Sequence, residues 1–375
     1  MPRLSDPLQL RGLSLRNRLV MAPMVTGLAL DGAPTQAQVE WYRLRARGGV
    51  ALVVVEAAAV VPDGTITPIQ LGLWDDAQVA GLAPLAQAIR AEGVPALLQL
   101  VHGGGRAVRP EPSAGRPAPE RVSASDVALL PGPRPRPMAE PEILVVVEAF
   151  ARAARRAQAA GFDGVELHAA HYYLLSQFLS PYTNRRTDRW GGGLEGRARL
   201  AVETVKAVRG AVGPDFLVSC RMHSMENLEG GLSTEDAAQV ARALEAAGLD
   251  ILNLSGIGQS SLGEWEGQPF LNSSSLLPKD APGGTLAASA GRVKAAVGIP
   301  VVTVGKLAEP GVAQAVLDRG DADLVALART LIADPQAPGK LLSGRDAEIN
   351  RCRQCLACFA AIRKGPVKCS VNREL

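Results

Sequence analysis

Two histidines and a tyrosine stand close together in the segment ELHAAHYY. His168 and His171 are three residues apart, and Tyr173 follows two residues later. Two neighbouring imidazoles can donate hydrogen bonds or accept them, depending on where each ring carries its proton. A phenol with a pKa of about 10 stays protonated at neutral pH and can deliver a proton. The alternatives are satisfied core histidines or a zinc site, although no third ligand with zinc-site spacing accompanies the pair.

Four of the five cysteines crowd into the end of the chain. Cys352, Cys355, Cys358 and Cys369 read C-x2-C-x2-C-x10-C. Four thiolates at this spacing suit a [4Fe–4S] cluster or a structural zinc ion, and the spacing alone does not decide between them. A secreted disulfide framework would distribute its cysteines along the chain. Cys220 stands alone in an apolar run and is expected to be buried and inert.

Glycine and cations follow the last two apolar runs of the chain before the cysteines. Gly305 and Lys306 come after one run, and Ala328 and Arg329 come after the next. In a barrel of parallel strands, backbone N–H groups and an arginine at these places bind phosphate. We therefore expect a phosphorylated cofactor or substrate. The competing interpretation is that Arg329 only caps the rim of the barrel.

Eight apolar runs could form the strands that position these residues. They are residues 18–22, 50–56, 96–100, 164–168, 217–221, 251–255, 301–304 and 324–327. Helical periodicity lies between them, at 36–48, 76–92, 142–161, 195–211, 233–248, 286–297 and 309–319. The runs are apolar throughout, as in parallel strands that are buried on both faces. This alternation predicts an α/β fold, a (β/α)8 TIM barrel over residues 1–345, with a doubly wound sheet as the competitor.

Two other segments are predicted to be loops. Gly191, Gly193 and Gly196 match the pattern G-x-G-x-x-G, but they follow an Arg-rich stretch rather than a strand, so dinucleotide binding is not expected there. Residues 105–141 are rich in Pro, Arg and Ala and are expected to form a lid over the barrel mouth or a mobile loop. Residues 346–375 are expected to form a short cysteine-rich segment that binds a cluster.

Composition excludes several classes of function. The chain has 375 residues with a net charge of +3, which is too mild for a dedicated nucleic-acid binder. The sequence contains no run of about 18 apolar residues, so no membrane span is expected. The N-terminus lacks a charged leader followed by an apolar stretch, so no signal peptide is expected and cytoplasmic residence is the default.

Four segments of the chain resemble the old yellow enzyme family. They are NRLVMAPM, LLQLVHGGGR, AGFDGVELHAAHYYLLSQFLSPYTNRRTDRWGG and ADLVALARTLIADP, and they occur in the order and spacing of that family. The resemblance covers residues 5–342 and implies a TIM barrel with FMN lying across its mouth and NAD(P)H as reductant.

The resemblance also implies roles for individual residues. His168 and His171 would bind an oxygen of the substrate, and Tyr173 would donate the proton. Arg221 would face flavin N1 and O2, where a permanent cation stabilises the anionic reduced ring. The other residues implied at the flavin are Pro23, Met24 and Val25 after the first strand, Ala57 and Gln99 at the ring edge, and Gly305, Lys306, Ala328 and Arg329 at the phosphate. Val25 stands where many members carry Cys or Thr, and Tyr172 replaces the usual Gly.

The cysteine run resembles one branch of the family, the 2,4-dienoyl-CoA reductases and trimethylamine dehydrogenases. Their final cysteine spacing is slightly longer than the ten residues found here. The branch implies a [4Fe–4S] cluster rather than zinc. Its members continue into FAD and NAD domains that do not follow here, either because a one-domain form is natural or because the sequence is part of a longer chain. In a natural one-domain form, electrons would come directly from NAD(P)H or from a partner that docks near the cluster. The family also implies a homo-oligomer.

These features leave three functions open. The first is an NAD(P)H-dependent ene-reductase, in which hydride from flavin N5 and a proton from Tyr173 reduce an activated C=C bond. The second is an amine dehydrogenase or N-demethylase acting on a methylated amine or betaine. Leu252 and Asn253 stand where trimethylamine dehydrogenases have Trp and Asp, although Trp265 and its two flanking glutamates could serve a betaine. The third is a flavin-free lyase with structural zinc, or an electron-transfer subunit without its own substrate.

Overall fold

A closed barrel of parallel strands forms the centre of the molecule. The computed structural model describes residues 1–108, 120–256, 259–274 and 276–374. The eight barrel strands are β3 (Leu19–Met21), β4 (Leu52–Ala59), β6 (Ala96–Val101), β9 (Gly164–Ala169), β10 (Leu217–His223), β11 (Ile251–Ser255), β14 (Val301–Val304) and β15 (Leu324–Leu327). Their order around the barrel follows the chain, and β3 pairs with both β15 and β4, which closes the circle. The predicted (β/α)8 barrel is therefore confirmed, and each strand lies on a run expected to form one.

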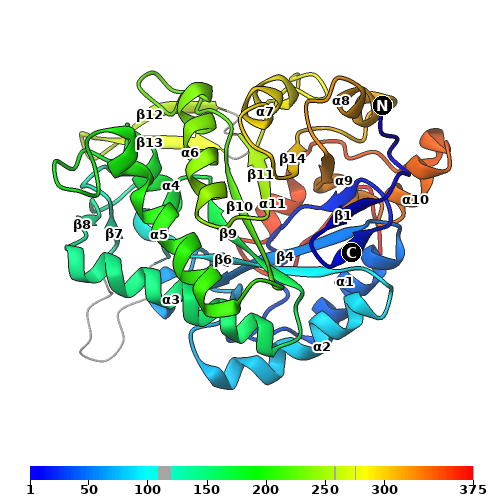
Figure 1. Ribbon diagram of the computed structural model, residues 1–375, viewed down its shortest axis with the longest axis horizontal. Helices are drawn as coiled ribbons and strands as arrows, with labels where there is room; N and C mark the ends of the chain where they lie inside the picture. The colour runs from blue at the N-terminus through cyan, green and yellow to red at the C-terminus, as the bar shows by residue number, and fades with distance from the viewer. Residues whose placement is uncertain (109–119, 257–258, 275, 375) are drawn as a thin grey trace.

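Helices cover the outside of the barrel (Figure 1). They are α1 (Gln36–Arg47), α2 (Val79–Arg90), α3 (Glu140–Ala159), α5 (Leu194–Val212), α6 (Thr234–Ala246), α7 (Ala287–Lys294) and α8 (Val312–Asp318). Each overlaps an expected helix. The starting residue differs most, and equally, at α2 and α8. Helix α2 is preceded by a 3-10 turn over Asp76–Gln78 with Asp75 as its cap. Within the described residues, no helix is long and apolar enough to cross a membrane.

One end of the barrel is closed by the N-terminal segment. Strands β1 (Leu8–Leu10) and β2 (Leu13–Leu15) form a hairpin whose Leu10 and Leu15 are buried. They belong to an apolar cluster with residues from the starts of the barrel strands, among them Leu52, Leu217 and Ile251. Because the hairpin fills the amino-terminal end, only the carboxyl end of the strands is left for a functional site, as is usual for this fold.

Several elements were not expected. The largest is a hairpin of β12 (Gln259–Trp265) and β13 (Gln268–Ser274) after β11. The others are α4 (Leu174–Leu179), α9 (Arg329–Ala333), α10 (Ala337–Leu342), α11 (Ala357–Ala361) and the short strands β5 (Leu71–Gly72), β7 (Val122–Ser123) and β8 (Arg136–Pro137). The G-x-G-x-x-G glycines lie only partly in a loop, because α5 begins at Leu194 and includes Gly196.

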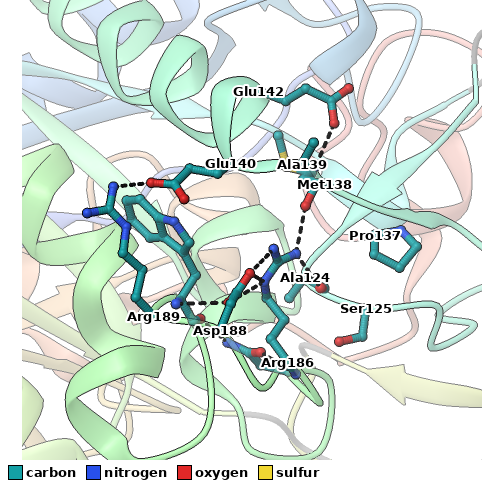
Figure 2. Close-up of polar contacts among 12 residues, drawn as sticks. Ala124, Ser125, Pro137, Met138, Ala139, Glu140, Glu142, Arg186, Asp188 and Arg189 are labelled. Carbon is teal, nitrogen blue, oxygen red and sulfur yellow. Dashed lines mark hydrogen bonds and ion pairs between the residues drawn. The ribbon is translucent and has the colours of Figure 1, made fainter.

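The stretch expected as a lid is anchored by an arginine. Residues 109–119 of that stretch lie outside the described residues. In the described part, strands β7 and β8 pair with each other. Arg186 donates from Nη1 to the carbonyls of Ala124 and Met138, at 3.2 and 2.7 Å, and its Nε contacts the carboxylate of Asp188. Figure 2 shows this guanidinium reaching from its own loop to both sides of the stretch.

Candidate active site

Strand pairing aligns polar residues inside the carboxyl half of the barrel. The first layer holds Gln99, Glu166 and Ser219, and the next holds His168, Arg221 and Asn253, each set joined by the parallel register. Residues two apart on a strand share a face, so Glu166 and His168 point to the same side of β9. All six side chains are buried. A polar patch of this kind inside an apolar barrel has to be internally hydrogen-bonded.

Glu166 is the centre of that patch and was missed in the sequence. Its Oε1 accepts from Gln99 Nε2 at 2.8 Å, and its Oε2 accepts from Asn253 Nδ2 at 2.7 Å and from Ser219 Oγ at 3.2 Å. Burial raises the pKa of Glu166, and the nearby charge of Arg221 opposes that rise. The available signal was an acidic residue in an apolar strand, two positions before a histidine.

Arg221 places a cation at the mouth of the barrel. Its guanidinium donates to Asn253 Oδ1 at 3.1 Å and to Ser255 Oγ at 3.2 Å. Burial lowers the pKa of Arg221, and Glu166 counteracts this. An arginine stays protonated at physiological pH even so. Arg221 is thus a buried positive charge, held in place by hydrogen bonds, that lines the cavity described below.

His168, His171 and Tyr173 come together as one cluster. The ring centroids of His168 lie 5.0 Å from His171 and 4.8 Å from Tyr173, and both pairs meet edge to face. Burial is the main cause that lowers the pKa of both histidines well below the usual value, so both are neutral at pH 7. Burial raises the pKa of Tyr173, which keeps the phenol protonated.

The hydrogen bonds around His168 assign its proton. The N–H of Ala170 donates to His168 Nδ1 at 3.3 Å, so the proton of the neutral ring is on Nε2. That nitrogen lies 3.3 Å from His171 Nδ1. The other ring nitrogen of His171 lies 3.0 Å from Ser255 Oγ, the same hydroxyl that Arg221 contacts. An oxygen that reaches the pair thus meets a neutral N–H donor on His168.

A cavity of about 320 Å³ opens at this end of the barrel. Its volume is in the range of roughly 300–1,000 Å³ that is usual for small-molecule sites. Seven of the ten residues expected at the flavin line it, together with His171: Pro23, Met24, Arg221, Gly305, Lys306, Ala328 and Arg329. Arg329 has no ion-pair partner among the described residues, so its charge is available to an anion in the cavity.

Five of the residues predicted at the flavin and substrate do not line the cavity: His168 and Tyr173 of the cluster above, and Val25, Ala57 and Gln99. Val25 is half-buried in the loop after β3, and Ala57 and Gln99 are buried within β4 and β6, so none of the three lines the cavity. Lys306 lines the cavity, but its ammonium donates to the carbonyls of Lys279, at 2.7 Å, and Ala281. The phosphate role expected for Lys306 therefore cannot rest on a free ammonium in this conformation.

Tyr172, which stands where the family usually has Gly, is not among the residues that line the cavity. Its ring is buried in a small apolar cluster with Val127, Leu129 and Leu271. Leu271 belongs to β13, and its N–H donates to the carbonyl of Ala128 at 2.9 Å. Tyr172 thus packs under the β12–β13 hairpin where that hairpin meets the stretch before α3.

The four C-terminal cysteines are free and line one small pocket. Arg329 and Cys352 line both this pocket and the larger cavity, so the two sites adjoin. Gln354 and Leu356 have left-handed backbone angles, with φ of 55° and 59°, which turn the chain sharply between the first three cysteines. Within the described residues, no set of three or more His, Cys, Asp or Glu side chains is gathered closely enough to hold a single metal ion.

A closed barrel with buried catalytic-type groups and a cation-lined cavity at its carboxyl end defines a barrel enzyme that binds an anionic cofactor or substrate. The model of the NADH:flavin oxidoreductase / NADH oxidase family matches residues 3–348. The chain belongs to this family, as the resemblance to old yellow enzymes predicted.

Three relatives illustrate the similarity. The NADH oxidase of Thermoanaerobacter brockii is 39% identical over 378 residues, which is 99% of this chain and 56% of that protein. The NADPH dehydrogenase of Halalkalibacterium halodurans is 34% identical, with 88% of this chain and 90% of that protein covered. The structure of a 2-naphthoyl-CoA reductase with 2-naphthoyl-CoA matches with a TM-score of 0.88 and 29% identity, over 99% of this chain and 57% of that one. This chain thus spans little more than half of the NADH oxidase.

Proposed function

We propose that the protein is an FMN-dependent ene-reductase that uses NAD(P)H to reduce a C=C bond conjugated to a carbonyl group. The observation that carries this proposal is the cluster of two neutral histidines and a protonated tyrosine, of which His171 lines a cavity together with the buried Arg221. The family description and the two dehydrogenase-type relatives support the use of a nicotinamide reductant.

The residues of the cavity fit FMN. The unpaired cation of Arg329 and the glycine turn at Gly305 suit its phosphate, and the buried cation of Arg221 suits a ring that gains negative charge on reduction. Bound there, FMN would supply a hydride carrier between NAD(P)H and the substrate. Arg221 would stabilise the reduced form and so raise its potential.

The substrate side follows from the protonation states. His168 carries an N–H on Nε2, which faces His171 Nδ1 at 3.3 Å. An oxygen that replaces this contact would receive that N–H, and it would receive a second one from His171 Nδ1 when the Ser255 hydroxyl donates to His171 Nε2. Two such donors on a carbonyl oxygen would draw electrons from the C=C bond. Tyr173, at 4.8 Å from His168 between ring centroids, would then give its proton to the α-carbon. The acyl-CoA bound to the 2-naphthoyl-CoA reductase supports a carbonyl-conjugated substrate.

We also propose that residues 346–375 bind a [4Fe–4S] cluster, next to a barrel over residues 1–345. Support comes from four free thiols that line one pocket and from the sharp turns between them. A cluster of four irons is larger than a single ion, so its thiolates stand around it at a wider spacing. Cys352 and Arg329 border both pockets, which would bring the cluster near the flavin. Zinc is the competing occupant.

A partner that exchanges electrons would dock on this segment. Six side chains in it are exposed cations without an ion-pair partner among the described residues: Arg351, Arg353, Arg363, Lys364, Lys368 and Arg373. Residues 1–350 hold 34 basic and 36 acidic residues, so the net positive charge of the chain comes from its last 25 residues. An acidic redox protein would complement this surface.

Anaerobic absorption spectra test the whole proposal. We expect flavin bands and a broad iron–sulfur shoulder, both bleached by NADPH or NADH, and about four irons per chain. Reduction of 2-cyclohexenone by the reduced protein would then demonstrate the activity. A colourless protein that contains zinc would overturn the flavoenzyme proposal. Flavin without iron would overturn only the cluster.

The amine-oxidising alternative has less support. Trp265, Glu264 and Glu266 are exposed at the turn of the β12–β13 hairpin, away from the cavity. Residue 253 is an asparagine, so it offers no carboxylate to a cationic amine. Its amide is already hydrogen-bonded to Glu166 and Arg221. Flavin that is bleached by dimethylglycine but not by NAD(P)H would favour this alternative.

A further inference from the structure

The turn that carries His171 has a backbone conformation that few side chains adopt. His171 and Tyr172 both have left-handed angles, with φ of 58° and 53°. Residues other than glycine are strained in this conformation. Two in succession persist only when neighbouring groups hold them. Because His171 belongs to the substrate-binding pair, the groups that hold this turn also set the geometry of that pair.

One group that holds the turn is a histidine outside the cavity. The backbone N–H of His171 donates to Nε2 of His223, the last residue of β10, over 2.7 Å. The side chain of His223 is 1% exposed, so no water competes for this bond. Since Nε2 accepts, the proton of the neutral ring lies on Nδ1. If the proton were on Nε2 instead, that N–H would face the backbone N–H of His171, and the two groups would repel each other.

Glu226 selects the tautomer that the turn needs. Its Oε1 lies 3.5 Å from His223 Nδ1, and this carboxylate is 1% exposed. Its Oε2 accepts from Ser180 Oγ at 2.7 Å and from the N–H of Leu232 at 2.9 Å, which fixes the carboxylate in place. A buried negative charge next to Nδ1 favours the proton on that nitrogen, as an outer carboxylate does for a metal-bound histidine.

The side chains of the turn have contacts of their own, and the ring centroids of His171 and Tyr172 also lie 5.7 and 5.8 Å from that of His223. The His171 ring contacts Ser255 Oγ, and the Tyr172 ring is buried with Leu271 of β13. His223 is one of three contacts that hold the backbone of the turn. The others are Gln177 Nε2, which donates to the Tyr172 carbonyl at 2.6 Å, and the N–H of Tyr173, which donates to the Ala170 carbonyl at 3.2 Å. Neither His223 nor Glu226 lines the cavity, and both side chains are only 1% exposed.

We propose that His223 and Glu226 are a positioning pair that holds the His171–Tyr172 turn so that His168 and His171 converge on a substrate oxygen. The inference rests on the proposed ene-reductase function, because it concerns how these two histidines receive that oxygen. It assigns the pair no proton transfer and no contact with the reacting atoms.

Histidine-selective ¹⁵N NMR tests the tautomer without any turnover. The chain has four histidines, so the side-chain signals of His102, His168, His171 and His223 can be assigned by substitution. We expect His223 to carry its proton on Nδ1, and we expect Glu226→Gln to reduce that preference. A wild-type His223 with its proton on Nε2 overturns the proposal.

A matched pair of variants tests the consequence. His223→Gln can keep an acceptor near the position of Nε2, whereas His223→Leu removes it. We expect His223→Leu to lower kcat/KM for 2-cyclohexenone about ten- to a hundredfold, the range for a small misplacement of reacting groups. The glutamine variant should recover most of this loss. Flavin content and midpoint potential should stay at wild-type values in both, because Arg221 and the cavity lining are unchanged.

The control is His102→Leu. His102 is also buried, and its Nδ1 also accepts a backbone N–H, from Gly104 at 3.0 Å. We expect it to leave kcat/KM within about threefold of wild type. Equal losses in His102→Leu and His223→Leu, or a glutamine variant as poor as the leucine variant, overturn the proposal. If His223→Leu does not fold, the NMR result and the glutamine variant decide. Wild-type protein without flavin or enone turnover defeats the proposed function instead.

Discussion

At the residue scale, Tyr173 is the group whose role is most directly testable. Its ring meets His168 edge to face, and burial keeps its phenol protonated. We predict that Tyr173→Phe lowers the rate of enone reduction about 10²–10⁴-fold, because a general acid is lost. Reduction of the flavin by NAD(P)H needs no such acid and should change little. Stopped-flow measurements separate the two steps, and equal losses in both would assign Tyr173 a role in shaping the pocket.

A second residue-scale prediction concerns Glu56, which is buried under the loop after β3. Thr26 Oγ1 and Gln38 Nε2 each donate to Glu56 Oε1 at 2.6 Å. Burial raises the pKa of Glu56 to about 7, and these hydrogen bonds limit the rise. An unfolded glutamate has a pKa of about 4.3 and ionises first as pH rises. This group therefore makes folding less favourable from about pH 4 up to about pH 7, and the cost is constant above that.

The measurement is denaturant unfolding of wild type and Glu56→Gln at pH 5 and pH 8. The quantity of interest is the free energy of unfolding of the variant minus that of the wild type. We expect this difference to be about 2–3 kcal/mol larger at pH 8 than at pH 5. The absolute difference at one pH includes the altered hydrogen bonds to Thr26, so the change with pH is the quantity to compare. A difference that does not change with pH would mean that Glu56 ionises normally.

The sequence brought the two histidines and the tyrosine to attention but not the residues behind them. His168, His171 and Tyr173 are close along the chain, so their spacing was visible. Glu166, His223 and Glu226 reach the site through strand pairing and a buried loop, and single-sequence patterns do not record such contacts. The direction of a side chain was equally hidden: the ammonium of Lys306 points away from the expected place, and the ring of Tyr172 is buried in an apolar cluster.

At the element scale, we predict that Arg186 ties the stretch before α3 to the body of the protein. Its hydrogen bonds to the carbonyls of Ala124 and Met138 are partly buried, and charged hydrogen bonds of this kind contribute about 1.5–3 kcal/mol. Arg186→Ala should speed proteolytic cleavage between residues 120 and 138. Arg189→Ala is the matched control, because its ion pair with Glu140 is half-exposed and worth at most about 1 kcal/mol. Figure 2 shows both arginines. Similar cleavage rates in both variants would contradict this role.

The cysteine segment is docked on the loop after β3, and a glycine permits this contact. Val367 N–H donates to the carbonyl of Thr26 at 2.7 Å, and a Cβ on Gly27 would come within 2.4 Å of the Gly365 carbonyl oxygen. We predict that Gly27→Ala displaces the segment and lowers the iron content of anaerobically purified protein. Gly93→Ala imposes a similar strain, with φ of +69° against +66°, but has nothing within 4 Å. Iron loss in both variants would assign the effect to backbone strain.

Strands and helices were easier to predict than the segments between them. Runs such as 251–255 and 301–304 coincide with β11 and β14 because buried parallel strands are apolar on both faces. The β12–β13 hairpin was missed because its strand β13 is largely polar and exposed, so neither alternation nor an apolar run marks it. Short helices such as α4 and α9 have too few turns to show a period.

At the scale of the whole molecule, charge and burial are distributed unevenly. Residues 1–350 are almost neutral and form the barrel with its helices, whereas the last 25 residues carry the excess of cations. Electrostatic association with an acidic partner should therefore depend on this segment and weaken with salt. We predict that Lys364→Glu with Lys368→Glu slows electron transfer to ferricyanide, an anion, at low ionic strength. Lys206→Glu on α5 is the control, and equal effects of both changes would contradict a localised surface.

The hairpin of β1 and β2 at the amino-terminal end has a kinetic consequence. With that end filled by Leu10 and Leu15, the barrel has one entrance, and a nicotinamide and an enone would have to occupy it in turn. The first product would leave before the second reactant arrives. Initial rates measured over a grid of both concentrations should then give parallel double-reciprocal lines. Each reactant in excess should also inhibit, because it would occupy the entrance when the other reactant has to bind.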